Sequence, residues 1–260
     1  MAVDYPEILA KNDLEDGTVT YDATEDDVYV AAHVADRGRL TKFVGEDTAT
    51  QRITFALTAA AEVDTFVFDK NFVITGGSAN VALQWSTGNS PYSWNTFANI
   101  TDFSDNTLPQ WKTDTAVTKQ YWSLYFTNLT AAPTVFNVWA GKRIALTTSP
   151  QGDFDPYNAE SIDAELSNPY GVSHSVHRAN KAILDAGFAG LTPTHMTDFE
   201  SWWTDAGKVG LPWWWLFAPD AYAAAASSTT APLYILSPGA RRNFPFSRAL
   251  RTGNLSGREV

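Results

Sequence analysis

Short runs of alternating apolar and polar residues dominate the first half of the chain. In Arg52–Leu57 and Val63–Phe68 the apolar side chains recur at every second position, which is the repeat of a β-strand with one buried face. Asn80–Trp85, Gln120–Thr127 and Thr134–Ala140 show the same repeat, and turn-forming residues separate the runs. Short strands at this spacing are typical of an antiparallel β-sandwich, so we expect one in the N-terminal part of the chain.

A long polar interval, residues 86–118, interrupts these strands and is expected to be a loop. Aromatic residues are scattered through it, and loops on a sheet scaffold often carry binding function. Two interpretations stay open. The rings could stack on a sugar, or they could cap the sandwich or meet a neighbouring subunit. The candidate rings are Tyr92, Trp94 and Trp111, with Asn89, Asn95 and Asp114 as hydrogen-bonding partners.

The pattern changes after residues 149–157, where proline and glycine indicate a domain boundary. A strand is expected at 171–179, followed by a more apolar segment at 181–189 and a helix at 193–206. Thr192 and Pro193 are the preferred residue types for a helix N-cap and first turn, and Gly207 fits the position after the helix. One helical face carries Met196, Phe199, Trp202 and Trp203.

The strand that follows this helix is apolar on both faces. Trp213, Trp215 and Phe217 alternate with Trp214 and Leu216, so both sides of the strand must be buried. The strand lies either inside its own domain or between this chain and a neighbour, because tryptophan is enriched at protein interfaces. The last expected strands are 233–236 and 244–250.

The composition favours folded domains and disfavours some classes of binding partner. Of 260 residues, 44% are apolar and 18% charged, which argues against disorder and permits two domains, 1–148 and 149–260. Without cysteine, neither disulfides nor thiolate metal sites can form. The net charge of −11 disfavours nucleic acid as a partner. No secretory signal and no membrane-spanning run is expected.

The sequence contains no strong motif for metal binding or catalysis. His174 and His177 lie three positions apart in an expected strand, so their side chains would point to opposite faces and could not share a metal. Asp153 and Asp155 lack the spacing of a calcium-binding loop. No nucleophile elbow, phosphate-binding loop or dinucleotide fingerprint is present. We therefore expect no catalytic residue, no metal and no cofactor.

The strand segments resemble the discoidin-type, galactose-binding-like β-sandwich. In that family a strand ending in leucine leads through a turn into an apolar strand with an aspartate, and a late tyrosine-tryptophan strand precedes the last one. Gln120 and Ser123 stand where that family usually has a basic residue, and its bracing disulfide is absent. The segments concerned are Arg52–Leu57, Ala59–Phe68, Trp85–Gly88, Gln120–Phe126 and Val135–Leu146.

The C-terminal part resembles structural proteins at the distal end of long-tailed bacteriophage tails. In those proteins an apolar strand bracketed by proline and a terminal leucine-glutamate-valine pattern recur. The corresponding segments here are Ser173–Arg178, the tryptophan-rich helix, Gly210–Asp220 and Arg241–Val260. This resemblance implies a tail-tip virion component, part of a symmetric ring or adaptor, with no chemistry of its own.

The two resemblances together imply a mainly β protein: a discoidin-like, jelly-roll-type sandwich followed by a smaller α+β tail-assembly domain. Its expected partners are other tail proteins and copies of itself. We expect it to be located in the virion tail, and in the host cytoplasm during assembly. The alternative is a carbohydrate-binding module that contacts host-surface glycans. Acidic residues concentrated near the N-terminus and basic ones near the C-terminus would suit self-assembly. The expected assembly or core residues are Trp202, Trp203, Trp213, Trp214, Trp215 and Phe217.

Overall fold

The structure is a computed structural model, and its strands are antiparallel throughout the parts that it describes. Among these residues, no helix combines the length and the apolar character needed to cross a bilayer. The described residues are 5–23, 29–36, 42–46, 48–68, 80–89, 91–101, 110–146, 148, 150, 159–167, 173–216, 233–236 and 252–259.

The chain forms two compact units. One contains Lys11–Arg143 and Ala218–Ala231, and the other contains Met1–Ala10, Ile144–Phe217 and Pro232–Val260. The division expected from the sequence assigned residues 1–10 to the sandwich. In the structure they belong with the C-terminal unit, because backbone pairing joins the N-terminal strand to that unit's sheet.

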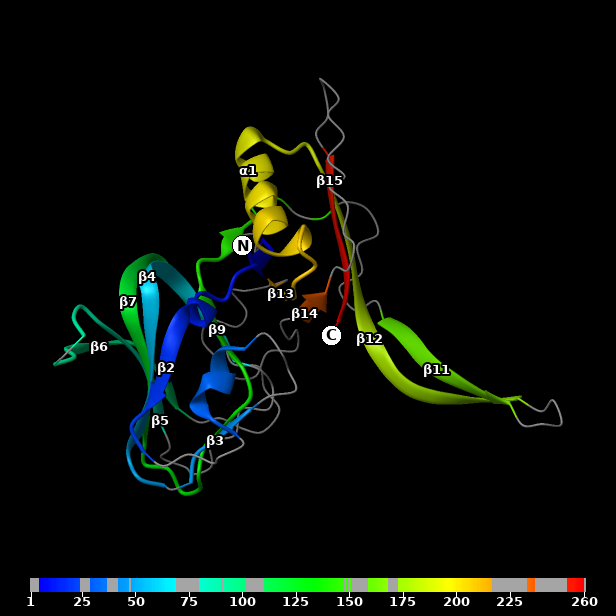
Figure 1. Cartoon of the computed structure of the whole chain (residues 1–260). Coiled ribbons are helices and arrows are strands. Elements are labelled where there is room, and N and C mark those ends of the chain that lie inside the picture. The colour runs from blue at the N-terminus through cyan, green and yellow to red at the C-terminus, as the bar shows by residue number, and fades with distance from the viewer. Residues whose placement is uncertain are drawn as a thin grey trace. The chain divides into compact units, whose positions relative to one another are not determined.

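A six-stranded sheet forms the main layer of the first unit. Five of its strands follow the order β2-β4-β7-β5-β6, and β9 pairs with the second half of β4 (Figure 1). Alternating side chains give the central strands one apolar face, which explains their pairing around a shared core. The strands are β2 (Gly17–Tyr21), β4 (Gln51–Phe68), β5 (Asn80–Ser86), β6 (Trp94–Thr101), β7 (Gln110–Thr127) and β9 (Val138–Gly141).

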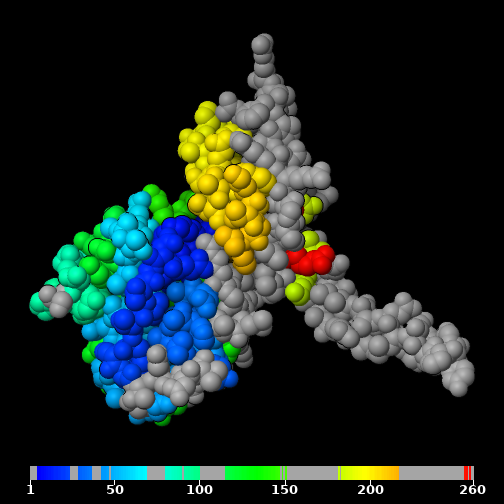
Figure 2. Space-filling view, viewed as in Figure 1, coloured from blue at the N-terminus to red at the C-terminus, as the bar shows by residue number. Residues whose placement is uncertain are grey.

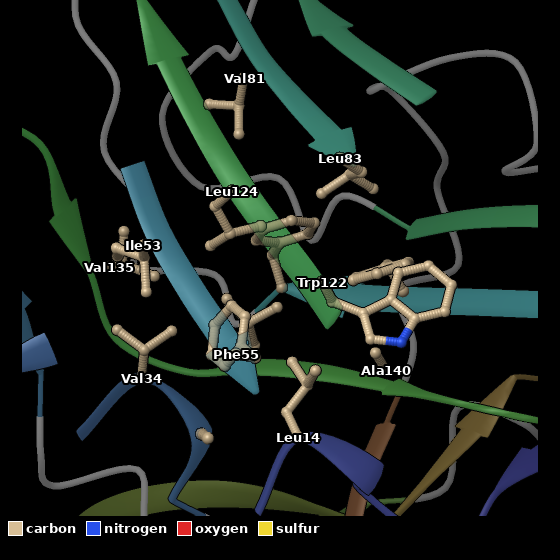
Figure 3. Packing of buried hydrophobic residues seen from close by; sticks show 14 of the residues in the cluster. Leu14, Val34, Ile53, Phe55, Val81, Leu83, Trp122, Leu124, Val135 and Ala140 are labelled. Carbon is tan, nitrogen blue, oxygen red and sulfur yellow. The ribbon is translucent and has the colours of Figure 1, made fainter. Parts of the chain in front are cut away.

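The second layer of this unit consists of smaller elements. Two 3₁₀ helices, η1 (Asp13–Asp16) and η2 (Ala31–Ala35), lie against the core with the pair β3 (Phe43–Val44) and β8 (Thr134–Val135). Figure 3 shows side chains from both layers converging on one another. Those labelled are Leu14, Val34, Ile53, Phe55, Val81, Leu83, Trp122, Leu124, Val135 and Ala140.

Two expectations about this sheet were wrong in detail. The runs 52–57 and 63–68 form the single strand β4, in which Thr58, Ala59 and Ala60 bulge out of the ladder. The interval 86–118 is not one loop, because it contains β6 and the beginning of β7. Trp94–Thr101 is too polar to be recognised as a strand from its sequence. It is a strand because it pairs with β5, which supplies the backbone hydrogen bonds.

The second unit is built on a seven-stranded sheet in the order β10-β1-β13-β14-β15-β12-β11. The strand β15 was not expected, since Thr252–Glu259 contains two glycines and little apolar surface. Its pairing with β12 and β14 overrides that weak local preference. The strands are β1 (Glu7–Leu9), β10 (Ile144–Ala145), β11 (Ala159–Ser167), β12 (Ser173–Ala189), β13 (Trp213–Leu216), β14 (Leu233–Leu236) and β15 (Thr252–Glu259).

An α-helix covers part of this sheet's core. In α1 (Pro193–Trp202) the Thr192 hydroxyl accepts from the His195 backbone N–H, and His195 Nδ1 accepts from the Thr192 N–H, which completes a capping box. Phe199 and Trp202 are buried with Trp213 and Trp215, while the opposite side of α1, in yellow, faces solvent (Figure 2). The expected helix and its cap are confirmed among the described residues.

The end of this helix differs from the prediction. Gly207 lies inside η3 (Trp203–Gly207), a π-helical turn in which Lys208 N–H donates to the Trp203 carbonyl. Beyond the helix, the positive φ falls on Gly210, at 67°, and not on Gly207. Gly207 is needed for a different reason, because a Cβ there would lie 2.9 Å from Trp203 Cε3.

The fold class expected from the sequence is confirmed. The described residues form antiparallel sheets, with a two-layer sandwich in one unit and an α+β arrangement with one α-helix in the other. The sequence segment 244–250 lies outside the described residues.

Candidate functional site

The outer face of the sandwich sheet carries a group of aromatic residues around one arginine. Trp122, Leu124 and Phe126 of β7 are buried in the core, so Tyr121 and Tyr125 project from the opposite face. We call the group formed by Arg52, Tyr92, Trp94, Tyr121 and Tyr125 the aromatic platform. Its members are half-buried, except for the more exposed Tyr92.

Strand register brings the platform together. Arg52 on β4 is the Cα partner of Tyr125 on β7, and Tyr121 is the partner of Ser86 on β5. Ser86 in turn pairs with Trp94 at the start of β6. Residues that are far apart in the sequence therefore meet across four adjacent strands.

The turn between β5 and β6 is shaped by the buried hydroxyl of Ser86. Its Oγ accepts from the Ser93 N–H at 2.9 Å and donates to the Gly88 carbonyl at 2.9 Å. These bonds hold the segment that contains Tyr92 close to the end of the sheet. The placement of Tyr92 thus follows from backbone contacts rather than from ring packing alone.

The rings touch one another in two geometries. Tyr92 stacks on Trp94 with ring centroids 4.8 Å apart and an interplanar angle of 26°. Tyr92 also meets Tyr121 edge to face, with centroids 5.6 Å apart. With 40% of its surface exposed, Tyr92 is the platform ring most accessible to a ligand.

Arg52 contacts two of these rings. Its guanidinium carbon lies 4.8 Å from the ring centroid of Trp94 and 4.3 Å from that of Tyr125, within the range of cation–π attraction. Nη2 donates to Gln84 Oε1 at 3.0 Å. Burial lowers the pKa of Arg52, and electrostatic interaction with Asp22 and Tyr125 acts in the opposite direction. The arginine stays protonated at any ordinary pH.

The sequence identified part of this site. Tyr92 and Trp94 were predicted as candidate rings, and in the structure they stack on each other. Trp111 lies on β7 as the Cα partner of Phe66, and its side chain is outside the described part of the structure, as is that of Asp114. Asn95 is exposed and donates to the Ser93 carbonyl, and Asn89 is exposed as well.

Sequence reasoning missed three platform residues, Arg52, Tyr121 and Tyr125. The alternation within Gln120–Thr127 was enough to place both tyrosines on the face opposite Trp122. Arg52 could not be assigned to the same place, because that requires knowing that β4 pairs with β7 and in which register.

An open pocket of about 570 Å³ lies elsewhere in the same unit, beside the bulge of β4. Lys11 Nζ lies 2.7 Å from a carboxylate oxygen of Asp13 and 2.7 Å from one of Asp16, and Lys142 Nζ lies 2.8 Å from Glu62. Burial opposes but does not cancel the effect of the two aspartates, which raise the pKa of Lys11. Because each lysine already has an acidic partner, the pocket is a weaker candidate for ligand binding.

The tryptophans of the second unit are core residues in a single chain. Trp202, Trp213, Trp214 and Trp215 are buried, and Trp203 is half-buried against the cluster that contains Trp202, Trp213 and Trp215. Trp202 meets Trp213 edge to face at 5.4 Å. Phe217 lies outside the described residues, so its predicted role stays a prediction.

Candidate metal residues gain no support. His174 and His177 both lie on β12, opposite Leu166 and Asp163 of β11. Asp153 and Asp155 are outside the described residues. Within the part of the chain that the structure describes, no cluster of three or more histidine or acidic side chains could hold a metal ion.

Comparisons with known proteins give a partial likeness. No family model matches the chain, and no curated protein does. A chitosan-binding module from a Paenibacillus chitosanase/glucanase is similar to 51% of this chain over 99% of its own length, with 18% identity and a TM-score of 0.43. A family 32 carbohydrate-binding module of C. perfringens NanJ, solved with galactose, has 12% identity, covers 52% of this chain and 98% of its own, and has a TM-score of 0.43.

A fucosidase from Ruminococcus gnavus, solved with fucose, is similar to 53% of this chain over 27% of its own length, with 14% identity and a TM-score of 0.43. Likenesses at these identities and TM-scores assign neither a family nor a ligand to this chain.

Proposed function

We propose that the sandwich unit binds carbohydrate through the aromatic platform, as a non-catalytic module. The observation that carries the proposal is the stack of Tyr92 on Trp94, at the margin of a sheet face that also presents Arg52 and Gln84. A sugar ring has apolar C–H faces and a rim of hydroxyl groups. An exposed aromatic ring beside fixed polar groups suits both features.

Glycan-array binding by the full chain, followed by titration calorimetry with the best ligand, tests this proposal. We expect Tyr92→Ala and Trp94→Ala each to weaken binding by roughly tenfold or more, as the loss of about 1.4 kcal/mol of stacking would do. Tyr29→Ala is the matched control, because Tyr29 is a similarly exposed tyrosine (39%) of the same unit that lies outside the platform. An array without hits, or equal affinity for Tyr92→Ala and the control, would contradict the proposal.

A second proposal is an assembly role, in which copies of the chain associate in a phage tail tip. The long ribbon formed by β11 and β12 supports it (Figure 1). Residues 173–182 of β12 pair with β11, and β15 joins β12 only from Ile183 onward. Among the described residues no third strand covers this ribbon. Two-stranded ribbons are marginally stable in water and offer unpaired edges to another chain.

Light scattering during size-exclusion chromatography tests this second proposal. We expect the full chain to form a multiple of the single-chain mass. A variant in which an Asn-Gly turn replaces residues 164–176 should have the mass of one chain, since Asp163 and His177 are opposite each other in the ribbon and can flank a two-residue turn. A full chain that is monomeric at all accessible concentrations would overturn the assembly role, and with it the proposed virion location and tail partners.

A further inference from the structure

We infer that the platform selects anionic sugars, whose carboxylate or sulfate group binds the guanidinium of Arg52. This inference rests on the proposed carbohydrate binding and specifies its ligand class. It starts from the contacts that hold the arginine in place, because a selective anion site needs a cation that is already oriented before the ligand arrives.

The guanidinium is oriented from three sides. Trp94 and Tyr125 contact it through their rings, and Gln84 Oε1 accepts a hydrogen bond from Nη2. Arginine presents its donors in a rigid planar fork that matches the oxygen atoms of a carboxylate or sulfate. Holding the side chain in advance lowers the conformational cost of binding such a group.

The donors of Arg52 are largely unused. Nε is buried without a hydrogen-bond partner, and Nη2 makes the one hydrogen bond of the guanidinium among the described residues. Nη1 has no acceptor among the described residues, and we assign it to the ligand's anionic group. Nor does any carboxylate among the described residues form an ion pair with the guanidinium. The Asp22 carboxylate accepts instead from the backbone N–H of Arg52, at 2.5 Å.

This cation is half-buried and has no ion-pair partner among the described residues, which makes an anionic ligand favourable. Partial desolvation disfavours the charged form, which is the reason that the pKa of Arg52 is lowered. An anion at Nη1 would compensate for that loss of hydration, whereas a neutral hydroxyl would do so less. The net charge of −11 repels anions at long range, so any preference for an acidic sugar must come from the local site.

Matched pairs of polymers test the inference with the full chain. Biolayer interferometry would compare immobilised polygalacturonate with its methyl ester, and dextran sulfate with dextran, at low and high salt. We expect about tenfold tighter binding to at least one anionic polymer than to its neutral counterpart, and a smaller difference at high salt. Preference for polygalacturonate would identify a carboxylate as the ligand group, and preference for dextran sulfate a sulfate.

The variant Arg52→Gln should lose this preference, so that it binds each anionic polymer no more tightly than its neutral counterpart. Lys208→Gln is the control, since it removes the same charge from an exposed position of the other unit. Equal binding of neutral and anionic polymers by the unmodified chain would overturn the inference but leave carbohydrate binding intact. Failure to bind any polymer, together with an empty glycan array, would reject both. Should Arg52→Gln fail to fold, the comparison on the unmodified chain still decides.

Discussion

At the residue scale, Gly207 shows how a missing side chain permits tight packing. An added Cβ would lie 2.9 Å from Trp203 Cε3 and 3.0 Å from Trp202 Cη2, closer than such atoms normally approach. Gly207→Ala would therefore push apart two rings of the core cluster. We expect a loss of about 1–3 kcal/mol of stability, the usual effect of overpacking, measured as a lower midpoint in urea by tryptophan fluorescence.

Gly187→Ala provides the control for this prediction. Gly187 lies on β12 of the same unit, and an added Cβ there meets nothing within 4 Å. This substitution should leave stability unchanged or raise it slightly, because it restricts the unfolded chain. Equal midpoints for both variants would mean that the tryptophan rings move aside without cost.

At the element scale, the capping box fixes the residue at which α1 begins, shortly after β12 ends. The Thr192 hydroxyl accepts from the His195 N–H at 3.3 Å, and His195 Nδ1 accepts from the Thr192 N–H at 3.1 Å. Thr192→Ala removes the first of these bonds and should cost about 1 kcal/mol, seen as a lower thermal midpoint. Thr194→Ala, an exposed change within the first turn, should cost clearly less. Similar losses for the two variants would show that the cap contributes nothing.

How far the sequence predicts such elements depends on how local their causes are. The start of α1 was predictable because Thr192 and Pro193 act within one turn. The central sandwich strands were predictable from their period-two pattern. By contrast, β6 and β15 have weak local preferences, and pairing with distant strands makes them strands. The position of Arg52 was unpredictable for the same reason as β6 and β15, since its place in the platform depends on the register between β4 and β7.

At the scale of the whole molecule, both units close through contacts between distant parts of the chain. In the second unit β1 lies between β10 and β13, so the sheet cannot be completed before residues near position 215 have been made. In the first unit β9 pairs with the second half of β4. Such long-range pairing slows folding and makes the connecting residues important for stability.

Asn12 is the residue where this closure can best be tested. It is fully buried, and its Nδ2 donates to the carbonyls of Ala35 and Val138, both at 3.0 Å. Its Oδ1 accepts from the N–H of Ala140 at 3.1 Å, 128 positions along the chain, and from that of Leu14. One amide group therefore joins η1 and the end of η2 to β9.

Asn12→Ala would leave buried carbonyl and N–H groups without these bonds. Because each unsatisfied group costs roughly 1–3 kcal/mol, we expect a loss on the order of 3 kcal/mol or more in the stability of the first unit. Asn95→Ala is the control, since Asn95 is exposed and its side chain donates to the nearby Ser93 carbonyl. Hydrogen exchange of amides on β4 and β9 would report the change. Unaltered protection there would mean that the strands hold the sandwich closed without Asn12, and that its long-range bonds are a consequence of the fold and not one of its causes.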